Sequence, residues 1–215
     1  MSYQLLIFDL DGTILDTLED LYLSVNYALK KQDFPERSLE EVRNFVGNGI
    51  RKLIERAVPE GTEEQKIQQV HQEFTEYYAL HCKDNTRPYA GITEVLKTCR
   101  EKGIKTAVVS NKADYAVQIL CKDYFPELFD IAVGEKQGVK RKPAPDSVQA
   151  VLNALQIPKE QALYIGDSDV DIQTAENAGM HCISVTWGFR NREFLIQHHA
   201  EKLVSSPEEL LLLIQ

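Results

Sequence analysis

Strand-like and helix-like segments alternate along the chain from residue 92 onward. Short apolar runs indicate strands, and apolar residues repeated every three to four positions between them indicate helices. The expected strands are Lys105–Ser110, Phe129–Val133, Ala162–Gly166 and His181–Val185, and the expected helices lie near Ile92–Lys102, Ala113–Lys122, Pro145–Leu155 and Val170–Ala178. Because parallel strands need a crossover connection between them, this alternation predicts an α/β protein with a parallel sheet.

The first part of the chain has a different pattern. Tyr3–Leu10 is an apolar run without helical periodicity that leads into Asp-Leu-Asp-Gly, so we expect a buried strand followed by a turn. Apolar residues then recur at helical spacing through several segments, until Arg-Pro-Tyr-Ala-Gly at 87–91 breaks the pattern as a hinge would. We therefore predict a Rossmann-like parallel sheet core of residues 1–15 and 87–215, with residues 16–86 inserted as a helical cap.

The composition limits the kinds of ligand that the chain can bind. It has 24 Lys and Arg residues against 33 Asp and Glu residues, and the formal net charge of −9 would repel nucleic acids and anionic membranes. Apolar runs such as Leu210–Ile214 are far shorter than the roughly 20 residues of a membrane span, and no leader-like segment precedes the first strand. We expect a cytoplasmic protein that binds a small molecule, without nucleic-acid or membrane partners.

Polar residues cluster where the expected strands end. The segments are Asp9–Thr13, Ser110-Asn111, the basic loop Lys140–Pro143 and Gly166–Asp171. Ligands of open parallel sheets bind at the carboxyl ends of the strands, so we expect these segments to meet there. Clustered carboxylates without nearby His or Cys favour a hard cation such as Mg²⁺. A phosphate group would complete the charge balance, with its oxygens bound by the Mg²⁺, the Ser-Asn pair and one lysine.

Each segment also has an ordinary structural interpretation when taken alone. Asp-Gly is a common turn, the Ser-Asn pair could cap the next helix, and the basic loop could be solvent-exposed. The acidic run Asp167–Asp171 resembles the start of a calcium loop, but Ile172 and Ala178 stand where such a loop needs Gly and Glu. Only together do the four segments supply the carboxylates, small hydrogen-bond donors and cation that phosphoryl transfer needs.

Together the four segments resemble the motifs of the haloacid dehalogenase superfamily, and specifically its phosphatases with a helical cap after the first motif. Asp9-x-Asp11-Gly12-Thr13 is similar to the first motif, Ser110 to the second, Lys142 to the third and Gly166-Asp167-x-x-x-Asp171 to the fourth. The resemblance covers essentially the whole chain.

The resemblance implies a role for each matching residue. Asp9 would attack phosphorus to form an aspartyl-phosphate, and Asp11 would protonate the leaving oxygen and then activate water. Mg²⁺ would be held by the Asp9 carboxylate, the Asp11 backbone carbonyl and Asp167. Asp171 would support this shell or orient Lys142. The phosphate-binding residues would be Ser110, Asn111 and Lys142.

Several other functions share parts of this pattern. A signalling receiver also accepts phosphate on an aspartate, but it lacks the cap, the first motif and the late Gly-Asp-x-x-x-Asp. Dehalogenation needs no acid two residues after the nucleophile, so Asp11 favours phosphate esters. A sugar phosphomutase keeps both aspartates, and pyrophosphate or nucleotide phosphatases use the same core. These last alternatives remain open.

Among the phosphatases, the chain most resembles the phosphoglycolate phosphatases. The resemblance rests on Asn44–Arg51 in the expected cap and on Asp171–Ala175 near the fourth motif. It implies that Asn48 and Arg51 approach the substrate, where a guanidinium could bind the carboxylate of phosphoglycolate. Alternatively, Arg51 lies on a helix surface and pairs with Glu55 four residues later.

Overall fold

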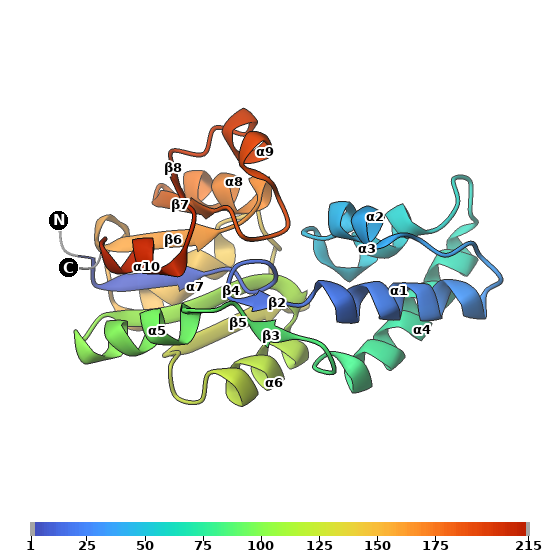
Figure 1. Ribbon diagram of the computed structural model, residues 1–215, viewed down its shortest axis with the longest axis horizontal. Helices are drawn as coiled ribbons and strands as arrows, with labels where there is room; N and C mark the ends of the chain where they lie inside the picture. Colours follow the sequence, from blue (N-terminus) through green and yellow to red (C-terminus); the bar gives the residue numbers. More distant parts are fainter. Residues whose placement is uncertain (1–2, 214–215) are drawn as a thin grey trace. The chain divides into compact units, whose positions relative to one another are not determined.

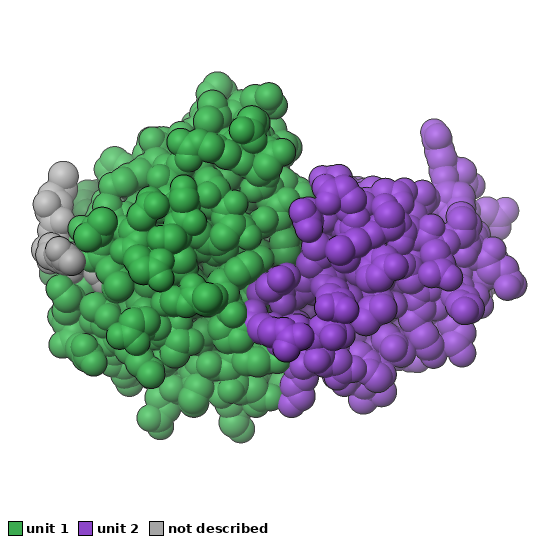
Figure 2. Space-filling model, viewed as in Figure 1, with its two compact units in different colours: residues 1–15, 88–215 green, residues 16–87 purple. Residues whose placement is uncertain are grey.

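The computed structural model describes residues 3–213, and the chain divides into two compact units. One unit contains residues 1–15 and 88–215, and the other contains residues 16–87 (Figure 2). None of the helices within residues 3–213 is long and apolar enough to cross a membrane.

The first unit is built on a six-stranded sheet with the strand order β5-β4-β1-β6-β7-β8 (Figure 1). Its strands are β1 Leu5–Phe8, β4 Lys105–Ala113, β5 Ile131–Glu135, β6 Ala162–Gly166, β7 His181–Val185 and β8 Lys202–Val204. All the neighbouring strands pair in parallel. The chain order reverses at β1, which lies between β4 and β6, and this is where such sheets bind their ligands.

Within residues 3–213, six helices of this unit accompany the sheet. They are α5 Ile92–Glu101, α6 Asp114–Tyr124, α7 Asp146–Leu155, α8 Asp169–Ala178, α9 Arg192–Gln197 and α10 Pro207–Leu211, and a short 3-10 helix, η1, spans Lys159–Gln161. Leu5 and Ile7 of β1 pack in one buried apolar cluster with Val151 of α7 and Ala175 of α8. Because side chains alternate along a strand, this places α7 and α8 over one face of the sheet. The α/β fold predicted from the strand–helix alternation is confirmed.

The start of β5 and the end of β4 differ from the predicted strand boundaries. Phe129 was expected inside a strand, but β5 begins at Ile131, and the Phe129 ring instead packs edge-on against Phe8 and Phe125. β4 extends to Ala113, beyond the expected end at Ser110, through a register shift between Val109 and Ala113. Apolar content alone could not separate a strand residue from an aromatic residue that packs beside the strand.

The second unit is helical. It contains α1 Leu18–Lys31, α2 Leu39–Phe45, α3 Gly49–Ala57 and α4 Glu64–His81, and α1 packs along α4 (Figure 1). α2 begins with a capping box in which the Ser38 side chain accepts from the Glu41 N–H and the Glu41 carboxylate accepts from the Ser38 N–H. Such caps satisfy backbone donors that the first helical turn leaves open.

The ends of the helical unit are tied together. β2 (Leu15–Asp16) pairs with β3 (Arg87–Pro88), so the segment expected as a hinge contains a short strand. The buried Asp20 carboxylate accepts the N–H groups of Asn85 and Thr86 at 2.8–3.1 Å, together with the Thr86 hydroxyl at 2.8 Å. One side chain therefore holds the start of α1 to the segment that follows α4.

Candidate active site

The site lies at the carboxyl ends of three adjacent strands. Asp9 directly follows β1, Ser110 and Asn111 lie in the last part of β4, and Asp167 directly follows β6. These four residues are 8 % exposed or less. Gly12 turns the chain after Asp9 with φ +84, and a Cβ there would overlap the Asp167 carboxylate. The turn can approach Asp167 only because position 12 is glycine.

Lys142 joins the acidic residues of the site. Its ammonium lies 2.8 Å from Asp9 Oδ1, 2.7 Å from Asp171 Oδ1 and 3.0 Å from the Tyr164 hydroxyl. The side chain is 3 % exposed. Burial alone would lower the pKa of Lys142, but the Asp171 and Asp9 carboxylates outweigh it and raise the pKa well above its ordinary value. The two carboxylates thus favour the charged form of Lys142.

Both carboxylate oxygens of Asp171 accept hydrogen bonds, and one of them holds Lys142 in place. Its Oδ1 accepts from Lys142 and from the Tyr164 hydroxyl at 3.2 Å. Its Oδ2 accepts from the Ser168 N–H at 3.1 Å and from the Ser168 hydroxyl at 2.6 Å. The second pair of contacts is the capping box of α8, so the helix start fixes the direction of the carboxylate.

The carboxylates of Asp9, Asp167 and Asp171 form a group that could hold a metal ion. One oxygen from each lies within 4.8 Å of the others, and all three residues are buried. Burial and the charge of Asp171 raise the pKa of Asp9 to about 7, against the lowering effect of Lys142. Burial, Asp171 and Asp9 raise the pKa of Asp167 well above its ordinary value. A site this acidic and this buried favours a divalent cation with oxygen ligands.

Asp11 faces a second buried ammonium group. The Lys112 ammonium lies 2.9 Å from Asp11 Oδ1, and the two side chains are 3 % and 14 % exposed. The site thus contains four carboxylates, Asp9, Asp11, Asp167 and Asp171, and two lysines.

Comparison with known proteins agrees with this geometry. Residues 6–185 match the haloacid dehalogenase-like hydrolase family. The chain belongs to that family. A phosphoglycolate phosphatase from Mannheimia succiniciproducens is 31% identical over 99% of each chain. A candidate phosphoglycolate phosphatase from Lactobacillus delbrueckii subsp. bulgaricus has a crystal structure that superposes with a TM-score of 0.93, at 39% identity, over 100% of this chain and 99% of the other.

The hydrolase is a phosphoric monoester hydrolase, as its motifs predicted. This finding removes the signalling-receiver alternative. A CbbY variant from Rhodobacter sphaeroides, solved in complex with xylulose-(1,5)bisphosphate, is 25% identical over 97% of this chain and 96% of its own, with a TM-score of 0.78. A protein that binds a sugar bisphosphate thus shares this fold.

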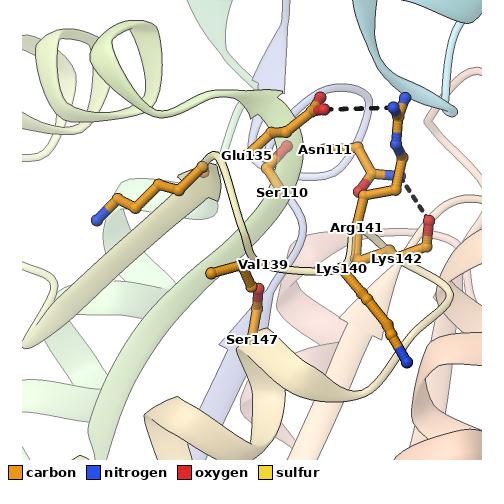
Figure 3. A pocket seen from close by; sticks show the side chains of 10 residues that line it. Ser110, Asn111, Glu135, Val139, Lys140, Arg141, Lys142 and Ser147 are labelled. Atoms are coloured by element: carbon orange, nitrogen blue, oxygen red, sulfur yellow. Dashed lines mark hydrogen bonds and ion pairs between the residues drawn. The ribbon is translucent and has the colours of Figure 1, made fainter.

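The phosphate-binding residues predicted for the hydrolase line a small pocket. Ser110, Asn111 and Lys142 lie along it, and the Asn111 amide donates to the Lys142 carbonyl at 3.0 Å (Figure 3). The neighbouring basic residues are exposed: Arg141 pairs with Glu135 at 3.5 Å, and the Lys140 side chain extends away from Ser110 (Figure 3). Of the three basic residues in this loop, the structure buries only Lys142.

Asn48 and Arg51 have partners within the helical unit. Asn48 precedes α3 and its side-chain oxygen accepts from Arg56 at 2.8 Å. The Arg51 guanidinium lies 2.7 Å from Glu55 and 2.6 Å from Glu64. The helix-surface ion pair considered as the alternative for Arg51 is present, with Glu64 as an additional partner.

The sequence analysis missed several residues of the site. The segment after β7 reaches the acidic cluster: the Phe189 N–H donates to Asp167 Oδ2 at 2.7 Å, and the Trp187 indole donates to the Thr13 carbonyl at 3.0 Å. Lys112 and Tyr164 were also missed. The rule that ligands bind at strand ends could have found the segment after β7, because it follows a strand of the sheet. Tyr164 lies inside β6, where only the fold reveals its contact.

Proposed function

We propose that this phosphatase hydrolyses a small phosphorylated metabolite, phosphoglycolate in the first instance, through an aspartyl-phosphate on Asp9. The observation that carries the proposal is the buried Lys142 ammonium between Asp9 and Asp171, beside Asp167. The Lys142 ammonium lies beside an Asp9 oxygen, where negative charge on the phosphate would increase during the reaction.

The proposed reaction has two steps. An Asp9 oxygen forms a bond to phosphorus while the ester P–O bond breaks, and Asp11 gives a proton to the departing oxygen. Asp11 then takes a proton from water as the water oxygen attacks the same phosphorus, which returns Asp9 as a carboxylate and releases inorganic phosphate. Ser110, Asn111 and Lys142 bind the phosphate oxygens during both steps.

A divalent cation, proposed to be Mg²⁺, fits the charge of the site. The Asp9, Asp167 and Asp171 carboxylates and the Lys142 ammonium together carry an excess of two negative charges, which one divalent ion would neutralise before a phosphate dianion enters. Asp9, the Asp11 backbone carbonyl and Asp167 would hold it, with Asp171 supporting. When bound, Mg²⁺ would act as a Lewis acid that polarises a phosphoryl oxygen.

The test of the mechanism compares the purified full chain with its Asp11→Asn variant. Hydrolysis of phosphoglycolate should require added Mg²⁺ and should fall roughly 100-fold or more in the variant, because both proton transfers lose their carboxylate. Binding of Mg²⁺ should be retained, since the proposed ligand at this position is the backbone. A variant with normal turnover would remove Asp11 from the reaction.

The choice of phosphoglycolate rests on the 31% identical relative and on Arg51. For Arg51 to bind the substrate carboxylate, that carboxylate must replace Glu55 or Glu64 as a partner of the guanidinium. Arg51→Ala should then lower kcat/KM for phosphoglycolate at least about tenfold and spare 4-nitrophenyl phosphate. Lys52→Ala is the control, because Lys52 is the neighbouring residue that also pairs with Glu55. Equal effects on both substrates would leave Arg51 a structural residue.

A sugar phosphate is the second candidate substrate, and a phosphomutase reaction is the second candidate activity. The complex of the CbbY variant with xylulose-(1,5)bisphosphate supports the first of these. A panel containing phosphoglycolate, sugar mono- and bisphosphates, pyrophosphate and nucleotides separates them. Release of inorganic phosphate identifies a phosphatase substrate, whereas transfer between sugar hydroxyls without net release identifies a mutase. Cytoplasmic residence belongs to this proposal as the setting for such metabolites.

A further inference from the structure

Lys112 is a buried lysine that the proposed reaction does not use. Its side chain is 3 % exposed, and its ammonium contacts Asp11 Oδ1 at 2.9 Å. Lysine is rarely buried unless it is paired, because removing an ammonium group from water is costly. The other buried lysine, Lys142, serves Asp9 and Asp171. Lys142 thus pairs with two of the four carboxylates of the site, and Lys112 pairs with a third, Asp11.

The backbone around Lys112 is held in position before any substrate binds. β4 shifts register against β5 between Val109 and Ala113, and the Lys112 N–H donates to the Ser110 hydroxyl oxygen at 3.3 Å. Gly134 of β5 lies so close that a Cβ there would come within 2.6 Å of the Lys112 carbonyl oxygen. Such an irregularity in a strand changes the direction in which a side chain points. The close contact with β5 restricts the movement of the backbone here.

We infer that Lys112 is a positioning residue that orients the Asp11 carboxylate for its proton transfers. The inference rests on the proposed function, in which Asp11 is the acid and base. Asp11 lies in the turn after β1, and a charge-assisted hydrogen bond from a fixed ammonium restricts the rotation of its carboxylate. Misplacing a catalytic group by about 1 Å can reduce a rate about 100-fold, so this restraint has a measurable effect.

The first test depends on the leaving group. An alkyl ester needs a proton on its departing oxygen, whereas 4-nitrophenolate leaves readily without one. Lys112→Met should therefore lower kcat/KM for ethyl phosphate about 10-fold to 100-fold and leave kcat/KM for 4-nitrophenyl phosphate nearly unchanged. The inhibition constant of inorganic phosphate should stay unchanged, because Ser110, Asn111 and Lys142 remain.

Two further variants separate orientation from folding. Lys112→Arg keeps a cation and should recover most of the activity on ethyl phosphate. Lys105→Met is the matched control, because Lys105 lies on the same strand and its ammonium pairs with Asp130 at 2.8 Å, but its side chain is 52% exposed. It should leave both substrates unaffected. Equal losses in the Arg and Met variants, or equal losses on both esters, would overturn the inference.

The second test is a double-mutant cycle with Asp11→Asn, measured on ethyl phosphate. If Lys112 acts through Asp11, Lys112→Met should reduce kcat/KM no further in the Asp11→Asn background. If the losses in kcat/KM from the two substitutions were fully additive, the inference would be overturned. It would also be overturned if Lys112→Met lowered kcat/KM only for phosphoglycolate, because Lys112 would then be a ligand of the substrate carboxylate. Normal activity of Asp11→Asn alone would overturn the proposed role of Asp11 and this inference together. A large loss in Asp11→Asn with none in Lys112→Met would overturn only the inference.

Discussion

At the scale of single residues, the site concentrates charge in a buried space. Asp9 illustrates the consequence, because burial and Asp171 raise its pKa from 3.8 to about 7 despite the contact with Lys142. Between pH 3.8 and about pH 7, Asp9 is protonated in the folded chain and ionised in the unfolded chain. The contribution of Asp9 to the stability of the metal-free protein should therefore fall as the pH rises from about 4 to about 7.

We predict that Asp9→Asn stabilises the metal-free protein at pH 8 while it abolishes hydrolysis. The amide removes a buried charge whose presence costs on the order of a few kcal/mol, and Lys142 retains Asp171 as its partner. The melting temperature at pH 8 should rise, roughly 2–4 °C per kcal/mol, and the difference from the unaltered chain should shrink toward pH 4. Added Mg²⁺ should stabilise the unaltered chain more than the variant. A lower melting temperature for the variant at pH 8 would contradict this prediction.

Lys142 provides a second prediction at this scale. Lys142→Met should reduce kcat/KM for aryl and alkyl phosphates alike, by about 100-fold or more, since the nucleophile and the phosphate lose a fixed cation. Lys140→Met and Arg141→Met are the controls, because both side chains are exposed. They should stay within about threefold of the unaltered enzyme. A large loss in either control would show that the wrong basic residue had been assigned to the third motif.

At the scale of elements, the turn after β1, the start of α8 and the segment after β7 all meet at Asp167. Thr13 donates to one Asp167 oxygen at 3.1 Å, and the Phe189 N–H donates to the other at 2.7 Å. A Cβ on Gly188 would overlap Asp167 Cβ and the Gly12 carbonyl oxygen. The three segments can meet only because glycine stands at this point.

Gly188→Ala should therefore displace Asp167 and weaken divalent-cation binding about tenfold or more, as changes around metal ligands commonly do. Isothermal titration with Mg²⁺ measures the effect directly. Gly138→Ala is the control, because it carries the backbone strain of φ +84 with no heavy atom within 4 Å of the added carbon. It should lose roughly 1 kcal/mol of stability and keep its affinity for Mg²⁺. Unchanged Mg²⁺ affinity in Gly188→Ala would show that the segment after β7 does not influence the metal site.

At the scale of the whole molecule, Asp20 connects the two ends of the helical unit. Its carboxylate, 2 % exposed, accepts hydrogen bonds from residues 65 and 66 positions later in the chain. Removing a buried acceptor leaves its donors without a partner, and each such donor costs about 1–3 kcal/mol. The contacts lie within residues 16–87, so the loss should be felt first in that unit.

Asp20→Ala should raise amide hydrogen exchange across α1 and α4 and leave β1, β4 and β6 protected. The expected loss of local stability is roughly 2–5 kcal/mol, measured by exchange and mass spectrometry. Asp84→Ala is the control, since Asp84 is 54% exposed and pairs only at the surface with His81. If exchange increases equally in both units, the chain unfolds as one cooperative body and this prediction is wrong.

Much of the fold could be predicted because its signals are local. β6 and β7 have the predicted boundaries, since each is a short apolar run bounded by polar or turn residues. The smaller elements after β7 were not predicted. β8 has three residues and α10 has five, which is too short for either periodicity to show. The carboxyl-end rule pointed to the segments that contain Asp9 and Asp167 and to the basic loop Lys140–Pro143, and the resemblance to the haloacid dehalogenase motifs selected Lys142 from that loop.

The amino-acid sequence alone determined the order of strands and helices and the polar residues that follow each strand, because periodicity and turn chemistry depend on neighbours in the chain. Only the tertiary structure decided which of these residues meet. Lys112 is 101 positions from Asp11, and Lys142 is 133 positions from Asp9. Nothing in local sequence distinguishes a buried, paired lysine from the exposed Lys140. The distinction arises when the sheet brings β1 between β4 and β6 and excludes water from the ammonium groups.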